Sequence, residues 1–146
     1  MRRMICGDGK MKCELVIVGA GPAGMAAAVS AYDAGIRDIL LLERGEREGG
    51  ILLQCIHNGF GLHRFGEELT GPEYAARYAD MVRERGIRVL TETTVLSVTR
   101  DRRVTAVSRT EGYMTLECGA VILAMGCRER PRGALNIPGF RPSGVY

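Results

Sequence analysis

A run of three glycines near the N-terminus, Gly19-Ala-Gly-Pro-Ala-Gly24, has the spacing of a loop that binds phosphate groups. It follows a short apolar run, residues 14–18, and precedes an alanine-rich stretch typical of a helix. Gly19 permits a tight turn, Gly21 lets backbone N–H groups approach a pyrophosphate, and Gly24 lets the helix pack closely. The helix N-terminus adds free N–H groups and a positive dipole end. The spacing therefore favours a dinucleotide site over a glycine-rich turn that binds nothing.

An acidic residue follows the glycine motif at the spacing expected of a dinucleotide site. Glu43 follows Gly24 by 19 residues and comes directly after an apolar run, residues 38–42. In that position a carboxylate accepts hydrogen bonds from both hydroxyls of an adenosine ribose, and it repels the 2′-phosphate of NADP. Taken alone, Glu43 is also compatible with an acid at the end of a surface strand. The glycines and Glu43 together do not decide between FAD and NAD.

The surrounding pattern supplies the elements that would position these groups. Residues 14–18 and 38–42 are predicted as buried strands on either side of a helix, residues 25–34, which ends at Gly35. A strand–helix–strand unit of this length implies a parallel pair with a right-handed crossover. Residues 43–69 are rich in glycine and are predicted as a long irregular loop, of the kind that is usually functional or mobile.

A second helix and further strands follow this loop. Thr70 is predicted to cap the helix, Pro72 fits its first turn, and Gly86 ends it. Its predicted buried stripe consists of Tyr74, Tyr78, Met81 and Val82. Residues 87–90 predict a third parallel strand; residues 94–100, 104–110 and 113–118 predict a three-stranded antiparallel meander; and residues 119–124 predict a fourth parallel strand. The fold class is therefore α/β, a Rossmann-like parallel sheet with helices and an added meander.

Composition excludes several classes of protein. The 146 residues are 46% hydrophobic and 25% charged, which is globular rather than disordered. The net charge is +3, and the excess of arginine falls in residues 100–146, at an expected hairpin tip and in a loop. Without stacking aromatic residues between them, these arginines do not predict nucleic-acid binding. No apolar run is long enough to span a membrane or to form a signal peptide, so we expect a soluble cytoplasmic protein.

The cysteines give no sign of a metal site or a disulfide framework. There are five, Cys6, Cys13, Cys55, Cys118 and Cys127, and no two have the Cys-x-x-Cys spacing of a zinc site. No metal ligand is therefore assigned.

Two later motifs resemble one family of flavoproteins. Gly49-Gly50 forms a second glycine pair after Glu43, and Ala124-Met125-Gly126 follows the fourth predicted strand. Together with the meander, they make residues 11–146 similar to the FAD domain of the pyridine nucleotide–disulfide oxidoreductase-like group, whose members carry Ala-Thr-Gly at the last position. The resemblance implies FAD as the cofactor. The expected cofactor-binding residues are Gly19, Gly21, Pro22, Ala23, Gly24, Glu43, Arg44, Gly50, Val95, Ala124 and Gly126.

A narrower resemblance rests on residues 51–61, on Cys127-Arg-Glu-Arg-Pro-Arg132 and on the glycine-containing segments at 137–139 and 144–146. These are similar to oxidoreductases found with glycerol-3-phosphate dehydrogenases, and to opine oxidase and hydrogen cyanide synthase subunits. Disulfide-reducing members carry two cysteines after the glycine pair. Leu52 and His57 hold those places here, which argues against a dithiol relay.

Two polar residues near the expected flavin remain without a decided role. His57 is either a proton donor to the flavin or a loop histidine that only forms hydrogen bonds. Cys55 is more typical of a small apolar residue than of a nucleophile. No catalytic residue is assigned.

We expect residues 1–10 to be an extension and residues 11–146 to be the N-terminal part of an FAD-binding domain, incomplete at its C-terminus. The resulting hypothesis is the FAD-binding portion of a flavin-dependent oxidoreductase of unknown substrate. The alternatives are NAD binding at the same site, a non-catalytic subunit that works with a second chain supplying the missing domain, and an inactive fragment.

Overall fold

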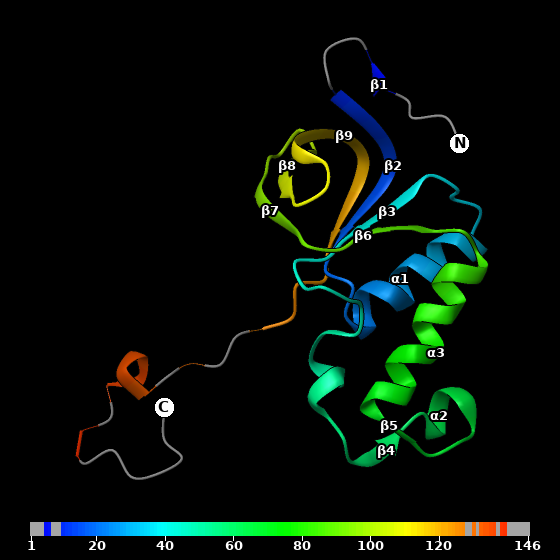
Figure 1. Ribbon diagram of the computed structural model, residues 1–146, viewed down its shortest axis with the longest axis vertical. Helices are drawn as coiled ribbons and strands as arrows, with labels where there is room; N and C mark the ends of the chain where they lie inside the picture. The colour runs from blue at the N-terminus through cyan, green and yellow to red at the C-terminus, as the bar shows by residue number, and fades with distance from the viewer. Residues whose placement is uncertain (1–4, 7–9, 128–129, 131, 137, 140–146) are drawn as a thin grey trace.

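The computed structural model describes residues 5–6, 10–127, 130, 132–136 and 138–139 (Figure 1). Its main sheet contains four parallel strands in the order β6 (Arg88–Leu90), β3 (Ile39–Leu42), β2 (Lys10–Val18) and β9 (Gly112–Leu123). The antiparallel strands β8 (Arg103–Ser108) and β7 (Thr93–Val98) extend the sheet beyond β9. The predicted Rossmann-like α/β fold with a meander is therefore confirmed.

Two helices lie side by side along one face of the parallel strands, α1 (Pro22–Asp33) and α3 (Gly71–Glu84) (Figure 1). Helix α1 begins after Gly21 with a proline in its first turn, and the chain leaves it at Gly35 with a φ of 107°. Helix α3 begins with a capping box, as Thr70 accepts from the Glu73 N–H and the Glu73 carboxylate accepts from the Thr70 N–H.

Strand β2 separates two apolar layers because its side chains alternate between the two faces of the sheet. Leu15 and Ile17 pack with the helices, whereas Val16 and Val18 pack with the meander, and all four are buried. Full burial of such a side chain contributes about 1.5–3 kcal/mol relative to exposure. Strand β2 is therefore apolar on both faces, as its sequence predicted.

The third meander strand and the fourth parallel strand are one element. Strand β9 pairs with β8 over Gly112–Glu117 and with β2 over Thr115–Leu123. Prediction separated them at Gly119 because the apolar pattern changes there from alternating to continuous. The apolar pattern changes because the environment of the strand changes along its length. In its first half, side chains alternate between the core and solvent.

Strand β2 is also longer than predicted. It begins at Lys10 and is joined by the short antiparallel strand β1 (Ile5–Cys6), so part of the predicted extension belongs to the sheet.

Residues 43–69 are not the irregular loop that was predicted. They contain η1 (Gly50–Gln54), β4 (Asn58–Phe60), α2 (Leu62–Phe65) and β5 (Leu69–Thr70), with β4 paired to β5. Glycines at positive φ separate these short elements, which is why the composition resembled a loop. Phe60 and Phe65 pack against Tyr74 and Tyr78 of α3 and hold the segment in place.

The predicted irregular tail, residues 128–146, lies partly outside the described residues. Within it the structure describes a short 3-10 helix, η2 (Arg132–Leu135). In the part of the chain that the structure describes, no helix is both long and apolar enough to cross a membrane.

Candidate dinucleotide-binding site

The glycine loop connects β2 to α1 and is packed too tightly for side chains at two of its positions. Gly19 has a φ of 102°, and a Cβ atom there would lie 2.4 Å from the carbonyl oxygen of Ala124. A Cβ atom at Gly24 would lie 1.9 Å from the carbonyl oxygen of Gly19. Both distances are shorter than any real contact, so only glycine fits at these positions. The tight turn and close helix packing predicted from the spacing are thus present.

Gly21 differs from these two glycines because a Cβ atom would fit there without overlap. A Cβ atom there would come no closer than 4.0 Å to another group, the Cα atom of Gly50. Gly50 belongs to η1, and the neighbouring Gly49 N–H donates to the Ala20 carbonyl oxygen at 2.9 Å. A Cβ atom at Gly50 would lie 3.1 Å from the Gly21 Cα atom, so the two predicted glycine motifs pack directly against each other.

This contact lies at the N-terminus of α1, where Pro22 and Ala23 form the first turn. No side chain caps the helix, and its first turn contains no acidic residue. The N–H groups of that turn and the positive dipole end are therefore available to an anion. An uncapped helix N-terminus beside a glycine loop fits the phosphate groups of a dinucleotide.

Glu43 stands at the C-terminal end of β3 and is tied to the glycine loop. Its Oε2 accepts from the Ala20 N–H and its Oε1 from the Gly45 N–H, both at 2.8 Å. An ionised carboxylate has about four acceptor positions. Two hydrogen bonds fix the side chain and leave acceptor capacity for the hydroxyls of a ribose.

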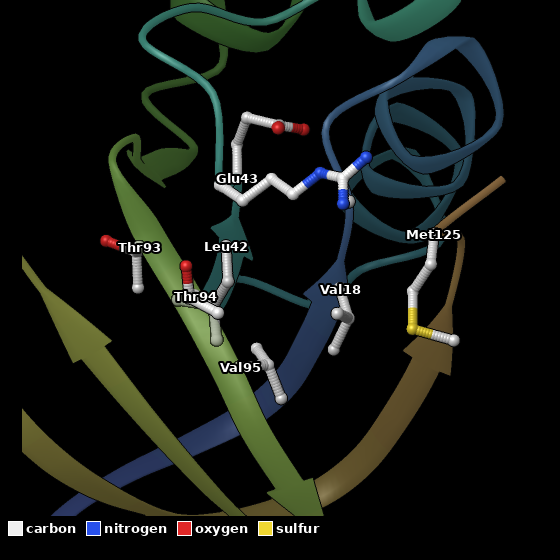
Figure 2. Close-up of a pocket in the computed structure, with 9 residues that line it drawn as sticks. Val18, Leu42, Glu43, Thr93, Thr94, Val95 and Met125 are labelled. Carbon is white, nitrogen blue, oxygen red and sulfur yellow. The ribbon is translucent and has the colours of Figure 1, made fainter. Parts of the chain in front are cut away.

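A cavity of about 230 Å³ opens beside this carboxylate (Figure 2). Its walls come from the C-terminal ends of β2 and β3, the start of β7 and the residue two beyond β9: Val18, Gly19, Leu42, Glu43, Arg44, Thr93, Thr94, Val95 and Met125. Pockets for whole drug-sized ligands measure about 300–1,000 Å³. The cavity is therefore of a size for one end of a dinucleotide.

The structure brings most of the predicted residues to this region. Gly19, Glu43, Arg44 and Val95 line the cavity, and Ala124 packs against Gly19. Gly126 is exposed, with a φ of 69°, and does not line the cavity.

Sequence reasoning missed the other five residues that line the cavity: Val18, Leu42, Thr93, Thr94 and Met125. In the sequence, Met125 was noticed only because it replaces the threonine of Ala-Thr-Gly. Its position directly after the fourth predicted parallel strand was the available signal, because the ends of parallel strands meet at one edge of the sheet.

Cys55 and His57 lie away from this cavity. Cys55 is half-buried, with Sγ 3.5 Å from the carbonyl oxygen of Ile51. His57 is exposed; its Nδ1 is 2.9 Å from the carbonyl oxygen of Asn58, and its ring lies 5.3 Å from that of Phe60.

Two other cysteines face each other in the core between the sheet and the meander. Cys13 of β2 pairs with Cys118 of β9. Burial raises the pKa of the Cys13 thiol, and burial followed by the neighbouring Cys13 raises the pKa of Cys118 to about 11. Among the described residues, no three His, Cys, Asp or Glu side chains are grouped as metal ligands.

Comparison with known proteins agrees with this geometry. Residues 13–144 match the pyridine nucleotide-disulphide oxidoreductase family model. The chain is 33% identical over 141 residues to an opine oxidase subunit from Agrobacterium tumefaciens (strain Ach5), covering 90% of this chain and 27% of that one. It is 31% identical over 142 residues to the HcnB subunit of hydrogen cyanide synthase from Pseudomonas protegens, covering 92% of this chain and 28% of that one. The chain thus spans little more than a quarter of the length of these relatives.

Solved structures show the same fold. Bacillithiol disulfide reductase Bdr of Bacillus cereus superposes with a TM-score of 0.68 at 23% identity, over 80% of this chain and 40% of that one. Thioredoxin reductase of Lactococcus lactis superposes with a TM-score of 0.63 at 26% identity, over 87% and 39%. The chain belongs to the pyridine nucleotide-disulphide oxidoreductase family of flavoproteins and carries part of its dinucleotide-binding domain.

Proposed function

We propose that this chain binds FAD and forms the FAD-binding portion of a flavin-dependent oxidoreductase. The observation that carries the proposal is the continuity of the site. Gly19 lines the cavity beside Glu43, and the loop that begins there leads to the uncapped N-terminus of α1 at Gly21. Adenosine would occupy the cavity, and the pyrophosphate would lie at the N-terminus of α1.

The chain's own residues would have separate tasks. Glu43 holds the ribose hydroxyls, and the first-turn N–H groups of α1 neutralise the pyrophosphate. Arg44, exposed at the cavity wall, adds a positive charge near the phosphates. The flavin supplies the electron transfer, while the protein binds and orients it.

The residues after the second glycine pair favour chemistry without a dithiol. Leu52 is buried and His57 exposed at the two places where disulfide-reducing relatives carry cysteines. With Cys55 alone between them, the chain has no resolving thiol there to form a disulfide.

Equilibrium dialysis of the purified chain against FAD, NAD⁺ and NADP⁺ tests the cofactor. We expect FAD to bind most tightly and NADP⁺ most weakly, since Glu43 repels a 2′-phosphate. Tighter binding of NAD⁺ than FAD would replace this proposal with NAD binding at the same site.

A second candidate function, that of one subunit completed by another chain, is supported by the free edge of β9. Pairing of β8 with β9 ends at Arg103 and Glu117, and none of the described strands pairs with Gly119–Leu123 on the side away from β2. Leu123 is 57% exposed beside an open groove of about 400 Å³. We propose that a partner chain adds a parallel strand at this edge, as an exposed strand edge is a template for pairing.

Hydrogen exchange tests this second proposal. In the complex isolated from the native host, amides of residues 119–123 should be protected relative to the isolated chain. Leu123→Lys should abolish that complex, whereas Leu135→Lys, at an exposed leucine of η2, should leave it intact. Unchanged exchange at residues 119–123 would contradict the proposal.

A further inference from the structure

Met125 lies at the cavity although it follows the last strand of the sheet. Its side chain lines the wall opposite β7, and Figure 2 shows Met125 and Val95 on either side of Val18. Its backbone is held by its neighbours. The Ala124 N–H donates to the Val18 carbonyl oxygen at 2.8 Å, and a Cβ at Gly19 would lie 3.2 Å from the Met125 Cα. The backbone is therefore fixed at the point from which the thioether extends.

The side chain itself is 64% exposed, which is unusual for a methionine beside an apolar cavity. Among the described residues, Met125 belongs to neither of the two core clusters. A ligand that enters the cavity would remove this apolar surface from water, a favourable change. Met125 therefore gains its main apolar contacts only when the cavity is filled.

The chemistry of the two facing walls favours a flat aromatic ring. Val95 and Met125 are both apolar, and neither side chain forms strong hydrogen bonds. The polar residues of the cavity lie to one side of this pair: Glu43 and Arg44 follow β3, and Thr93 and Thr94 precede Val95 on β7. A nucleoside can satisfy both sets of groups, with its ribose at Glu43 and its base between the apolar walls. Sulfur also makes favourable contacts with aromatic rings.

We propose that Met125 strengthens binding at this site by packing its thioether against the base of an adenine nucleotide. The inference rests on the proposed function, because it assigns the cavity to the adenosine end of the dinucleotide. It predicts that Met125 acts on ADP and FAD alike and has no effect on FMN, which lacks the adenosine.

Isothermal titration calorimetry with ADP, FAD and FMN tests the assignment on the intact chain. Met125→Ala should weaken ADP and FAD by the same factor, about three- to tenfold, the size of a sulfur–aromatic contact. Met125→Leu, which keeps the apolar wall, should lose less affinity. The matched control is Leu62→Ala, a similarly exposed apolar residue of α2 that does not line the cavity.

The outcomes separate the two proposals. Unchanged ADP affinity in Met125→Ala, or a loss confined to FAD, would overturn the role of Met125 while FAD binding stands. Binding of ADP without FAD by the unmodified chain would overturn the proposed function, and the role of Met125 would still be decided with ADP. Absence of binding to both nucleotides would overturn both. The thermal unfolding midpoint without nucleotide should be the same in all variants, which excludes a structural effect.

Discussion

The side-chain carboxylate of Glu43 accepts a hydrogen bond from the backbone N–H of Ala20 at 2.8 Å and so joins the end of β3 to the glycine loop. The same carboxylate accepts from the Gly45 N–H. Glu43 therefore shapes the loop as well as offering acceptors to a ligand. A substitution there has two effects, which measurements of binding and stability can separate.

Replacing Glu43 by alanine should weaken FAD binding by about tenfold or more, because hydrogen bonds to a charged group contribute about 1.5–3 kcal/mol each. Glu43→Gln keeps a neutral acceptor and should lose less affinity. Cys55→Ala should bind FAD as the unmodified chain does, since Cys55 does not line the cavity. Equilibrium dialysis measures all three, and equal retention of FAD in Glu43→Ala and Cys55→Ala would refute the assigned roles.

Two glycines of the loop predict two different failures. Gly21→Ala should fold with unchanged stability but lose FAD, because a methyl group is tolerated at its φ of −75° and would stand beside the N–H groups that we expect to hold the pyrophosphate. Gly24→Ala should instead destabilise the fold by about 1–3 kcal/mol, since its methyl group overlaps the Gly19 carbonyl oxygen. Urea unfolding and FAD binding should be measured on both variants. Loss of stability in Gly21→Ala with FAD affinity retained would reverse the assignment.

The capping box of α3 predicts a dependence of stability on pH. Hydrogen bonds from the backbone N–H and the hydroxyl of Thr70 lower the pKa of Glu73 from its usual 4.5. A carboxyl with a lowered folded-state pKa stabilises the fold above its unfolded pKa, and this contribution is lost as the pH falls through the folded pKa. Glu73→Gln should therefore lower the urea midpoint at pH 7 more than at pH 3. An equal difference at both pH values would show that the charge of Glu73 has no part in the cap.

Thr70→Ala removes the hydroxyl side of the same cap and should cost about 1 kcal/mol, the usual loss at an N-cap. Urea unfolding at pH 7 measures it. Thr70→Ser, which keeps the capping hydroxyl, is the matched control and should change stability little. A similar loss in both variants would contradict a specific contribution from the cap.

The cysteines should differ in their rates of alkylation. Cys127 is exposed, whereas Cys13 and Cys118 are buried and have raised pKa values, about 11 for Cys118. Because the thiolate is the reacting form, iodoacetamide at pH 8 should label Cys127 well before Cys13 and Cys118. Peptide mass spectrometry over time measures each rate, with urea-unfolded protein as the control in which the difference disappears. Rapid labelling of Cys118 in the folded chain would contradict its burial.

Much of the fold was predictable because local patterns and tertiary packing agree. The apolar runs at Leu15–Val18 and Ile39–Leu42 are buried on both faces, as continuous apolar strands of a parallel sheet must be. The helix cap at Thr70 and the position of Glu43 followed from short-range chemistry in the same way. These features depend on residues close together in the sequence.

The features that were missed depend on contacts between distant residues. Residues 43–69 form short elements because Phe60 and Phe65 pack on α3. No periodic pattern of apolar residues in the sequence indicates that contact. Met125 lines the cavity only because β9 pairs with β2 and ends at the same edge. The spacing in the sequence pointed to Glu43 and the glycines. The position of Met125 opposite Val95 depends on the assembled sheet, so the spacing could not predict it.

The pairing of β2 with β9 has a consequence for the order of folding. Leu15 pairs with Ala120, a separation of 105 residues, and Gly19 meets the Ala124 carbonyl oxygen just beyond that ladder. Contacts so distant in sequence form slowly, because the whole intervening chain must be closed into a loop first. During synthesis the glycine loop is therefore made about 105 residues before its neighbour Ala124. The edge of the sheet at which the cavity lies is completed only by this late contact between distant parts of the chain.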